Sequence, residues 1–332
     1  MTRSASGFAA FAVTMLAGSF SWAQQVAPAA RPVVQPVVQP SASEPKAKPK
    51  VYDESADGKK QIEAALAKAK KNNRRVLVQW GANWCGWCVK MHGLFKADRE
   101  IAKELLYEYD VVYIDVGRFD KHMDLATAYG ADLKANGLPF LTILDADGKP
   151  LANQETGSLV KKPEADKDNP AEHDPAAVLA LLAKHQAAHP EAKAVLDAAM
   201  AEAKKDGKQV FVHFGAPWCG WCHRLEDWMA RPEIAAILAK EFVDCKIDVD
   251  RTKNSAAVTK QFGKDDKGGI PWFCFVAADG TKNADSDGPQ GNVGFPAAPE
   301  EIEHFKAMLT KSVRKMSSGD VEALAASLRE KK

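Results

Sequence analysis

Two pairs of cysteines in this chain have the spacing of a dithiol that can open and close a disulfide bond. Residues 84–88 read WCGWC, and the same five letters return at residues 218–222. Each copy follows an apolar run typical of a strand and precedes a segment with helical spacing. The first thiol of each pair therefore lies at a helix N-terminus, where free N–H groups and the helix dipole stabilise a thiolate. The second thiol follows one turn later, close enough to form a small disulfide.

Length and composition describe an ordinary globular protein with room for about two domains. The chain has 332 residues, of which 46% are hydrophobic and 27% charged, and its net charge is +1. This balance gives no general attraction to nucleic acid or to anionic lipid. Two of the six cysteines, Cys245 and Cys274, lie outside the pairs.

Residues 1–23 have the pattern of a secretory signal peptide. Arg3 precedes an uncharged stretch with a short apolar centre, and Ser21 and Ala23 are the small residues expected before cleavage after Ala23. The alternative is a retained anchor, because the uncharged stretch is just long enough to cross a bilayer. We expect a periplasmic or secreted protein without stable membrane insertion after cleavage. In such a compartment a thiol pair rests as a disulfide unless a donor reduces it.

The rest of the chain is a linker followed by two similar halves. Residues 24–51 are proline-rich and predict a flexible linker. Matching features then recur at an almost constant offset, from Cys85 to Cys219 and from Pro139 to Pro271. This offset indicates an internal duplication, with one domain at residues 52–188 and a second at residues 189–332.

Hydrophobic periodicity predicts the elements that position the cysteines. In the first half we expect strands at residues 76–80, 111–116 and 140–144. We expect helices at 59–71, from the dithiol to about 105 with a kink, at 125–134 and at 176–188, and a polar loop at 153–174. In the second half we expect strands at residues 210–214, 242–249 and 273–276, and helices at 192–205, after the dithiol, at 300–309 and at 321–328, with a surface loop at 283–299.

This order of elements resembles the thioredoxin fold, twice. The features that carry the resemblance are a strand, Trp-Cys-x-x-Cys, a helix, a further strand and an apolar-Pro step into another strand. The WCGWC form is similar to exported bacterial thioredoxin-like domains. The resemblance implies an α/β fold class with two tandem thioredoxin-like domains. Each would have a central mixed β-sheet of four or five strands flanked by helices on both faces.

The resemblance also implies a role for each residue of the two sites. It matches Cys85 and Cys219 to the exposed attacking cysteine, Cys88 and Cys222 to the buried resolving cysteine, and the pairs Cys85–Cys88 and Cys219–Cys222 to redox-active disulfides. Pro139 and Pro271 match the family's cis-proline, which lies against the dithiol and turns backbone groups toward an extended substrate. Trp84 and Trp218 would shield the dithiols.

Two positions depart from the family pattern. The family often has a buried acid six residues before the first cysteine, where this chain has Gln79 and His213. Glutamine cannot exchange a proton and histidine can, so the second site is better equipped for proton transfer. The alternative is that both are buried polar residues with structural hydrogen bonds. The second departure is the residue before the resolving cysteine, which is Trp87 or Trp221. The two residues between the cysteines tune the reduction potential of the disulfide, and the sequence leaves the direction of that effect open.

Cys245 and Cys274 lie in two predicted strands that, in the family's sheet order, flank the central strand. Strands two places apart in a sheet are too distant for a disulfide. We therefore expect two buried, unpaired thiols.

The leading hypothesis is a thiol–disulfide oxidoreductase that acts on protein disulfides or thiols, in the reductase direction and without a cofactor. A membrane or soluble redox partner would recycle its dithiols. The alternatives are a disulfide oxidase or isomerase, a thioredoxin-fold binding or scaffold protein, and a zinc site made of the four paired cysteines. The strand-to-helix position of each pair favours redox use over metal binding.

Overall fold

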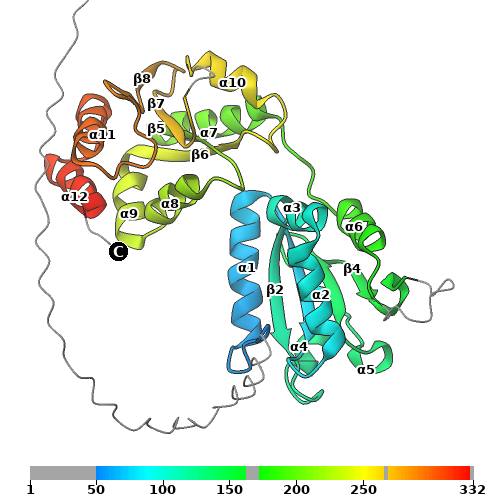
Figure 1. Ribbon diagram of the computed structural model, residues 1–332. Coiled ribbons are helices and arrows are strands. Elements are labelled where there is room, and N and C mark those ends of the chain that lie inside the picture. The colour runs from blue at the N-terminus through cyan, green and yellow to red at the C-terminus, as the bar shows by residue number, and fades with distance from the viewer. Residues whose placement is uncertain (1–49, 162–171, 265–267, 330–332) are drawn as a thin grey trace, which may run out of the picture. The chain divides into compact units, whose positions relative to one another are not determined.

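The computed structural model describes residues 50–161, 172–264 and 268–329. Within them, two four-stranded mixed sheets of the same topology follow one another along the chain (Figure 1). The predicted signal peptide and nearly all of the predicted linker lie outside the described residues. No described helix is long and apolar enough to cross a membrane.

The first sheet has the order β2-β1-β3-β4, with β1 (Arg75–Gly81) and β3 (Phe140–Leu144) in its centre. The strand β2 (Tyr109–Asp115) runs parallel to β1, whereas β3 is antiparallel to β1 and β4 (Pro150–Glu155) is antiparallel to β3. Side chains of β1 alternate between two cores because successive residues of a strand point to opposite faces. One face packs on α1 (Gly58–Asn72), α4 (Met123–Ala128) and α5 (Leu133–Asn136), and the other on α2 (Gly86–Ala97), α3 (Arg99–Glu108) and α6 (Pro175–Lys184).

The second sheet repeats this order as β6-β5-β7-β8. Its strands are β5 (Gln209–Gly215), β6 (Phe242–Asp248), β7 (Trp272–Val276) and β8 (Lys282–Asp285). One face packs on α7 (Ala192–Asp206) and α10 (Ser255–Gln261), and the other on α8 (Gly220–Met229), α9 (Pro232–Glu241), α11 (Pro299–Ser312) and α12 (Ser318–Arg329). A two-stranded hairpin of β9 (Asp287–Gly288) and β10 (Gly291–Asn292) follows β8. The predicted fold class is therefore confirmed in both halves.

Two predicted helices of the first half are each divided. The helix after the first dithiol breaks at Asp98, whose side chain accepts hydrogen bonds from the N–H groups of Glu100 and Ile101 and begins α3. Such capping stabilises a new helix start at the expense of continuing the old one. The single helix predicted at residues 125–134 is replaced by α4 and α5. Gly130 lies between them with a φ of +77°, a backbone conformation that ends a helix.

Both predicted loops that follow the third strand contain an edge strand. The loop predicted at residues 153–174 begins inside β4 and continues through the 3₁₀ helix Gly157–Leu159, and the loop predicted at residues 283–299 contains most of β8 and the β9–β10 hairpin. Side chains of β4 and β8 are exposed or only partly buried. Because one side of each strand faces no partner strand and neither face is fully covered, the apolar alternation that marks a buried strand is missing.

The two unpaired cysteines lie on opposite sides of the central strand of the second sheet. Cys245 of β6 and Cys274 of β7 are both aligned with Val212 of β5, so that β5 separates them. Both are buried free thiols, which confirms the prediction. Burial raises the pKa of the Cys245 thiol to about 12 and also raises that of Cys274.

We expect iodoacetamide to leave Cys245 and Cys274 unmodified in the native, unreduced protein at about pH 8. Thiolate is the reactive form, and pKa values raised far above the working pH keep both sulfurs protonated and enclosed. In denaturant without reductant the same reagent should add two groups, which intact mass and peptide mapping would locate at these cysteines. A Cys245–Cys274 crosslink, or rapid labelling of the native protein, would contradict this arrangement.

Candidate active site

In both halves the first cysteine of the pair forms the N-cap of the helix that follows. Cys85 precedes α2 and Cys219 precedes α8, each with an extended backbone conformation. The Sγ atom of each accepts a hydrogen bond of 3.1 Å from the backbone N–H of the second cysteine. The paired sulfurs are bonded, with 5.2 Å between the Cα atoms in both sites. A sulfur therefore occupies the place of the usual capping oxygen and receives the partial positive charge of the helix start.

The attacking sulfurs are more enclosed than the resemblance implies. Cys85 is 7% exposed and Cys219 4%, against 0% for Cys88 and 2% for Cys222. Within each pair the first cysteine is the more exposed, which agrees with the attacking and resolving roles. The expectation that the first cysteine is exposed is nevertheless wrong for the closed disulfide.

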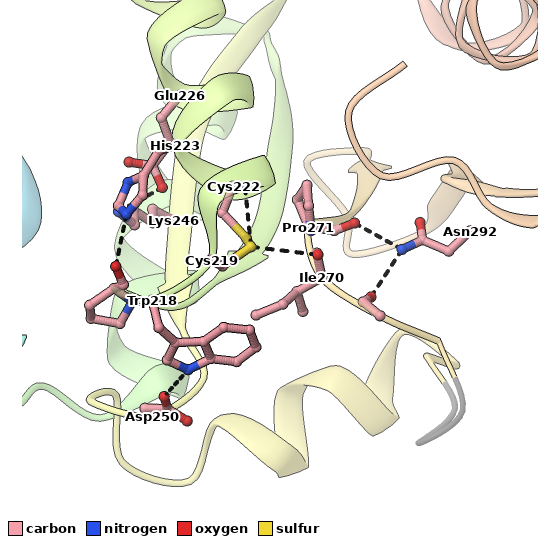
Figure 2. The surroundings of a disulfide bond; sticks show 12 residues. Trp218, Cys219, Cys222, His223, Glu226, Lys246, Asp250, Ile270, Pro271 and Asn292 are labelled. Carbon is pink, nitrogen blue, oxygen red and sulfur yellow. Dashed lines mark hydrogen bonds and ion pairs between the residues drawn. A yellow bond between two sulfur atoms is a disulfide. The ribbon is translucent and has the colours of Figure 1, made fainter. Parts of the chain in front are cut away.

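The tryptophans Trp84 and Trp218 lie half exposed at the surface of the two sites. Each indole N–H donates a hydrogen bond to the segment after the parallel strand. Trp84 Nε1 donates to the Gly117 carbonyl at 2.6 Å. Trp218 Nε1 donates to Asp250 Oδ2 at 2.8 Å (Figure 2). These bonds fix the position of each ring beside its dithiol.

A cis-proline stands against each dithiol. The Leu138–Pro139 and Ile270–Pro271 peptide bonds are both cis. In the second site, Cys219 Sγ lies 3.5 Å from the carbonyl oxygen of Ile270 (Figure 2). Side chains hold these loops in place, because Thr156 Oγ1 donates to the Pro139 carbonyl at 2.7 Å and Asn292 Nδ2 donates to the Pro271 carbonyl at 2.9 Å.

Tyr52 and Gln79 lie beside the resolving cysteine of the first site. A Cβ atom at Gly81 would lie 2.2 Å from Tyr52 Oη and 2.8 Å from Cys88 Sγ, so glycine is required where β1 ends. Gln79 Nε2 donates to Tyr52 Oη at 2.6 Å and to the Cys88 carbonyl at 3.2 Å. Burial raises the pKa of Tyr52, which keeps the phenol protonated at neutral pH.

Charged groups take the equivalent place in the second site. A Cβ atom at Gly215 would lie 3.3 Å from Cys222 Sγ and 3.8 Å from Glu226 Oε1. The sulfur of Cys222 and the carboxylate of Glu226 therefore both lie next to Gly215. Glu226 is buried and forms an ion pair of 2.7 Å with Lys246 Nζ. His213 is also buried, and its Nε2 atom lies 2.9 Å from Asp244 Oδ1.

The two sites can be compared position by position through the strand register. Gln79 is aligned with Tyr113 in the first sheet, and His213 is aligned with Lys246 in the second. Four residues after the resolving cysteine, the first site has His92 where the second has Glu226. The pKa of His92 is lowered by burial and, to a smaller extent, by Lys96, which favours the neutral imidazole.

Glu226 is the functional candidate that sequence reasoning missed. The proton-transfer role predicted for His213 stays a prediction, because its imidazole is hydrogen-bonded to Asp244. The spacing of four residues between Cys222 and Glu226 places both on one face of α8, and this spacing could have identified Glu226. Among the residues that the structure describes, no cluster of three or more His, Cys, Asp or Glu could hold a metal ion.

Comparisons with known proteins agree with this geometry. The thioredoxin-like family matches residues 57–146 and 191–278, and so covers both dithiols and more than half of the chain. A curated Aspergillus niger protein named protein disulfide-isomerase tigA is 23% identical over 232 residues, which span 68% of this chain and 58% of that protein. This chain therefore spans less than two thirds of that relative's length.

Two similar solved structures each match less than half of this chain. A disulphide isomerase from Xylella fastidiosa Temecula1 is 30% identical, with a TM-score of 0.35, covering 42% of this chain and 98% of that one. The oxidised C-terminal domain of DsbD from Neisseria meningitidis is 25% identical, with a TM-score of 0.25, covering 30% of this chain and 84% of that one.

We expect the Glu226–Lys246 pair to set the pKa of the reduced Cys222 thiol. In a Cys219→Ser background, Glu226→Gln removes the anion and leaves the cation, which should lower the Cys222 pKa by about one unit. Lys246→Met leaves the anion and should raise it by a similar amount. The ultraviolet absorbance of the thiolate, followed between roughly pH 5 and pH 10, measures both shifts.

A matched control is Glu63→Gln, which breaks an exposed pair with Lys59 on α1 and should leave the Cys222 pKa unchanged. Shifts of the same sign in the Glu226 and Lys246 variants, or no shift in either, would show that the pair does not act on this thiol.

Proposed function

Because the chain belongs to the thioredoxin-like family, we propose that it is a thiol–disulfide oxidoreductase with one dithiol site in each half. One observation supports this above the others. In both halves the first cysteine caps a helix, accepts an N–H hydrogen bond from the second cysteine and lies in the same site as a cis-proline. A scaffold protein requires neither the sulfur pair nor the cap, whereas dithiol exchange requires both.

In the first step, the thiolate of Cys85 or Cys219 attacks one sulfur of a protein disulfide. A new enzyme–substrate S–S bond forms, the substrate S–S bond breaks, and the second substrate sulfur leaves as a thiolate that takes a proton from water. The helix N-terminus contributes by stabilising the attacking thiolate, which raises its fraction at neutral pH.

In the second step, Cys88 or Cys222 loses its proton and attacks the neighbouring enzyme sulfur. The enzyme disulfide closes, the mixed disulfide breaks, and the first substrate sulfur leaves and is protonated. Two electrons have then passed from the dithiol to the substrate. We propose that Glu226 receives the proton in the second site, whereas Gln79 and Tyr52 of the first site offer hydrogen bonds.

We assign the reductase direction and a periplasmic or secreted location. The location rests on the signal-peptide pattern of residues 1–23, followed by a linker and by domains at residues 52–188 and 189–332. In that compartment a membrane or soluble thiol protein must return two electrons to each disulfide after turnover. The exchange chemistry itself involves sulfur and protons, and needs no cofactor.

We expect a Cys85→Ser, Cys219→Ser double variant to lose insulin reduction by roughly a thousandfold, because both nucleophiles are removed. Each single variant should keep the activity of the other site, and turbidity of the precipitating insulin B chain measures all three. The control is Cys245→Ala, Cys274→Ala, which removes the thiols outside the dithiols and should retain the rate. Full activity in the Cys85, Cys219 double variant would refute the mechanism.

The direction of electron flow is tested by equilibrating each single-site variant with glutathione redox buffers. Potentials below about −220 mV are expected for reductants, whereas values near about −120 mV would identify an oxidant.

A further inference from the structure

A short segment that precedes α1 passes beside the first dithiol. The backbone N–H groups of Val51 and Tyr52 both donate to Asn83 Oδ1, at 2.9 and 3.0 Å. Asn83 Nδ2 in turn donates to the Tyr52 carbonyl at 2.9 Å and to Glu54 Oε1 at 2.8 Å. Because Asn83 belongs to the loop between β1 and the dithiol, one side chain clamps this segment to the loop that carries the reacting sulfur.

The clamped segment holds the phenol of Tyr52 beside the resolving sulfur. Tyr52 is buried, and it forms one apolar cluster with Cys85 and Cys88. The three heavy atoms nearest to a Cβ atom built on Gly81 are Tyr52 Oη, Tyr52 Cζ and Cys88 Sγ, at 2.2, 2.6 and 2.8 Å. The hydroxyl oxygen and the resolving sulfur therefore lie next to the same point at the end of β1.

The hydrogen bond from Gln79 leaves the Tyr52 hydroxyl with a proton to donate. Gln79 Nε2 donates both to Tyr52 Oη and to the Cys88 carbonyl. A carbonyl can only accept, so the amide nitrogen must face it, and the phenol oxygen accepts from Gln79 instead of donating to it. Among the described residues, Gln79 Oε1 is buried without a hydrogen-bond partner, and the bond from Gln79 is the one that the Tyr52 hydroxyl forms. The O–H group is therefore available as a donor.

The resolving sulfur needs such a donor when it becomes a thiolate. Cys88 is fully buried, and its own N–H already donates to Cys85 Sγ. A buried anion without a hydrogen bond is strongly destabilised, because it has lost its contact with water. In the reduced site the Cys88 sulfur must nevertheless carry a negative charge before it can close the disulfide. The Tyr52 hydroxyl is placed to supply the hydrogen bond that this anion requires.

The ionisable groups packed around Tyr52 come from β2 and α2. Tyr113 of β2 packs edge-on against Tyr52, with 6.0 Å between ring centroids, and His92 of α2 packs edge-on against Tyr113 at 5.1 Å. Asp115 of β2 is buried and lies 3.6 Å from Lys121 Nζ. Burial is the main cause that raises the pKa of Tyr52, and the negative charge of Asp115 adds to it. The phenol therefore keeps its proton and can act as a donor at neutral pH.

We propose that Tyr52 stabilises the Cys88 thiolate by donating a hydrogen bond to it during the second step of exchange at the first dithiol. The phenol keeps its own proton throughout, and the Cys88 proton leaves to water before the sulfur attacks Cys85. The enzyme disulfide then forms, the mixed disulfide breaks, and the substrate sulfur departs with the electron pair of the broken bond. This inference rests on the proposed oxidoreductase function, and it makes the segment before α1 part of the first site.

The first test measures the pKa of the Cys88 thiol in the full chain. Its background removes the other dithiol sulfurs through three substitutions, Cys85→Ser, Cys219→Ser and Cys222→Ser. Tyr52→Phe keeps the ring and removes only the hydroxyl, so it should raise the Cys88 pKa by about one unit. The ultraviolet absorbance of the thiolate measures this value, with the Cys88→Ser protein as the blank. The matched control is Tyr113→Phe, which removes a second phenol hydroxyl from the same cluster and should leave the pKa unchanged.

The second test follows closure of the enzyme disulfide in the Cys219→Ser, Cys222→Ser protein, whose first dithiol is intact. The reduced protein is mixed with one equivalent of the aromatic disulfide dithiobis(nitrobenzoate) in a stopped-flow instrument. Cys85 releases one thionitrobenzoate when it attacks, and Cys88 releases the other when the enzyme disulfide closes. Tyr52→Phe should slow the second release about threefold at neutral pH and leave the first unchanged. The thiolate becomes about tenfold scarcer, and its greater nucleophilicity offsets part of that loss.

An unchanged Cys88 pKa in the Tyr52→Phe protein, or an equal shift in the Tyr113→Phe protein, would overturn the role of Tyr52 while leaving the oxidoreductase function intact. Failure of the Cys219→Ser, Cys222→Ser protein to release the second thionitrobenzoate would instead overturn the proposed function at this dithiol. The pKa comparison would still decide whether Tyr52 stabilises the thiolate, because it requires no turnover.

Discussion

The hydrogen bond from the second cysteine's N–H to the first cysteine's sulfur is the constraint on which both sites depend. It requires a helix that begins at the first cysteine, directly after a strand. It also requires the resolving sulfur to lie against the last residue of that strand, which is Gly81 in one half and Gly215 in the other. A side chain there would displace the sulfur or its neighbours. Because this corner tolerates so little change, differences between the sites arise in the residues around it.

Sequence patterns predict the parts of this fold whose physical cause is local. The buried strands have continuous apolar runs, and β3 was predicted with its observed bounds. Edge strands β4 and β8 were missed because their stability comes from hydrogen bonds to a neighbouring strand rather than from burial of alternate side chains. At Asp98 the sequence predicted a kink rather than two separate helices, since the apolar spacing continues across a residue whose carboxylate starts a new helix.

The two dithiol sites, like the fold, could be predicted only in part from the sequence. Cysteine spacing and strand context located the dithiols, but the surroundings of the resolving thiol depend on which strand lies beside β1 or β5. Lys246 lies next to His213 only through the parallel register of β5 and β6. That register brings its ammonium to Glu226 on α8. A buried carboxylate without this partner would cost several kcal/mol, so the two residues are stable only as a pair. Pairing of this kind across elements is invisible in a single sequence.

The residues around the second dithiol form two groups that are physically separate. Glu226 and Lys246 lie on one side of the disulfide, whereas Pro271 and Asn292 lie on the other (Figure 2). The first group comes from α8 and β6, the second from the cis-proline loop and the hairpin after β8. Changes in one group therefore leave the contacts of the other intact. In a duplicated domain, the residues around the resolving thiol and those around the cis-proline loop can accordingly change independently, while the strand-to-helix corner that holds the sulfurs stays the same.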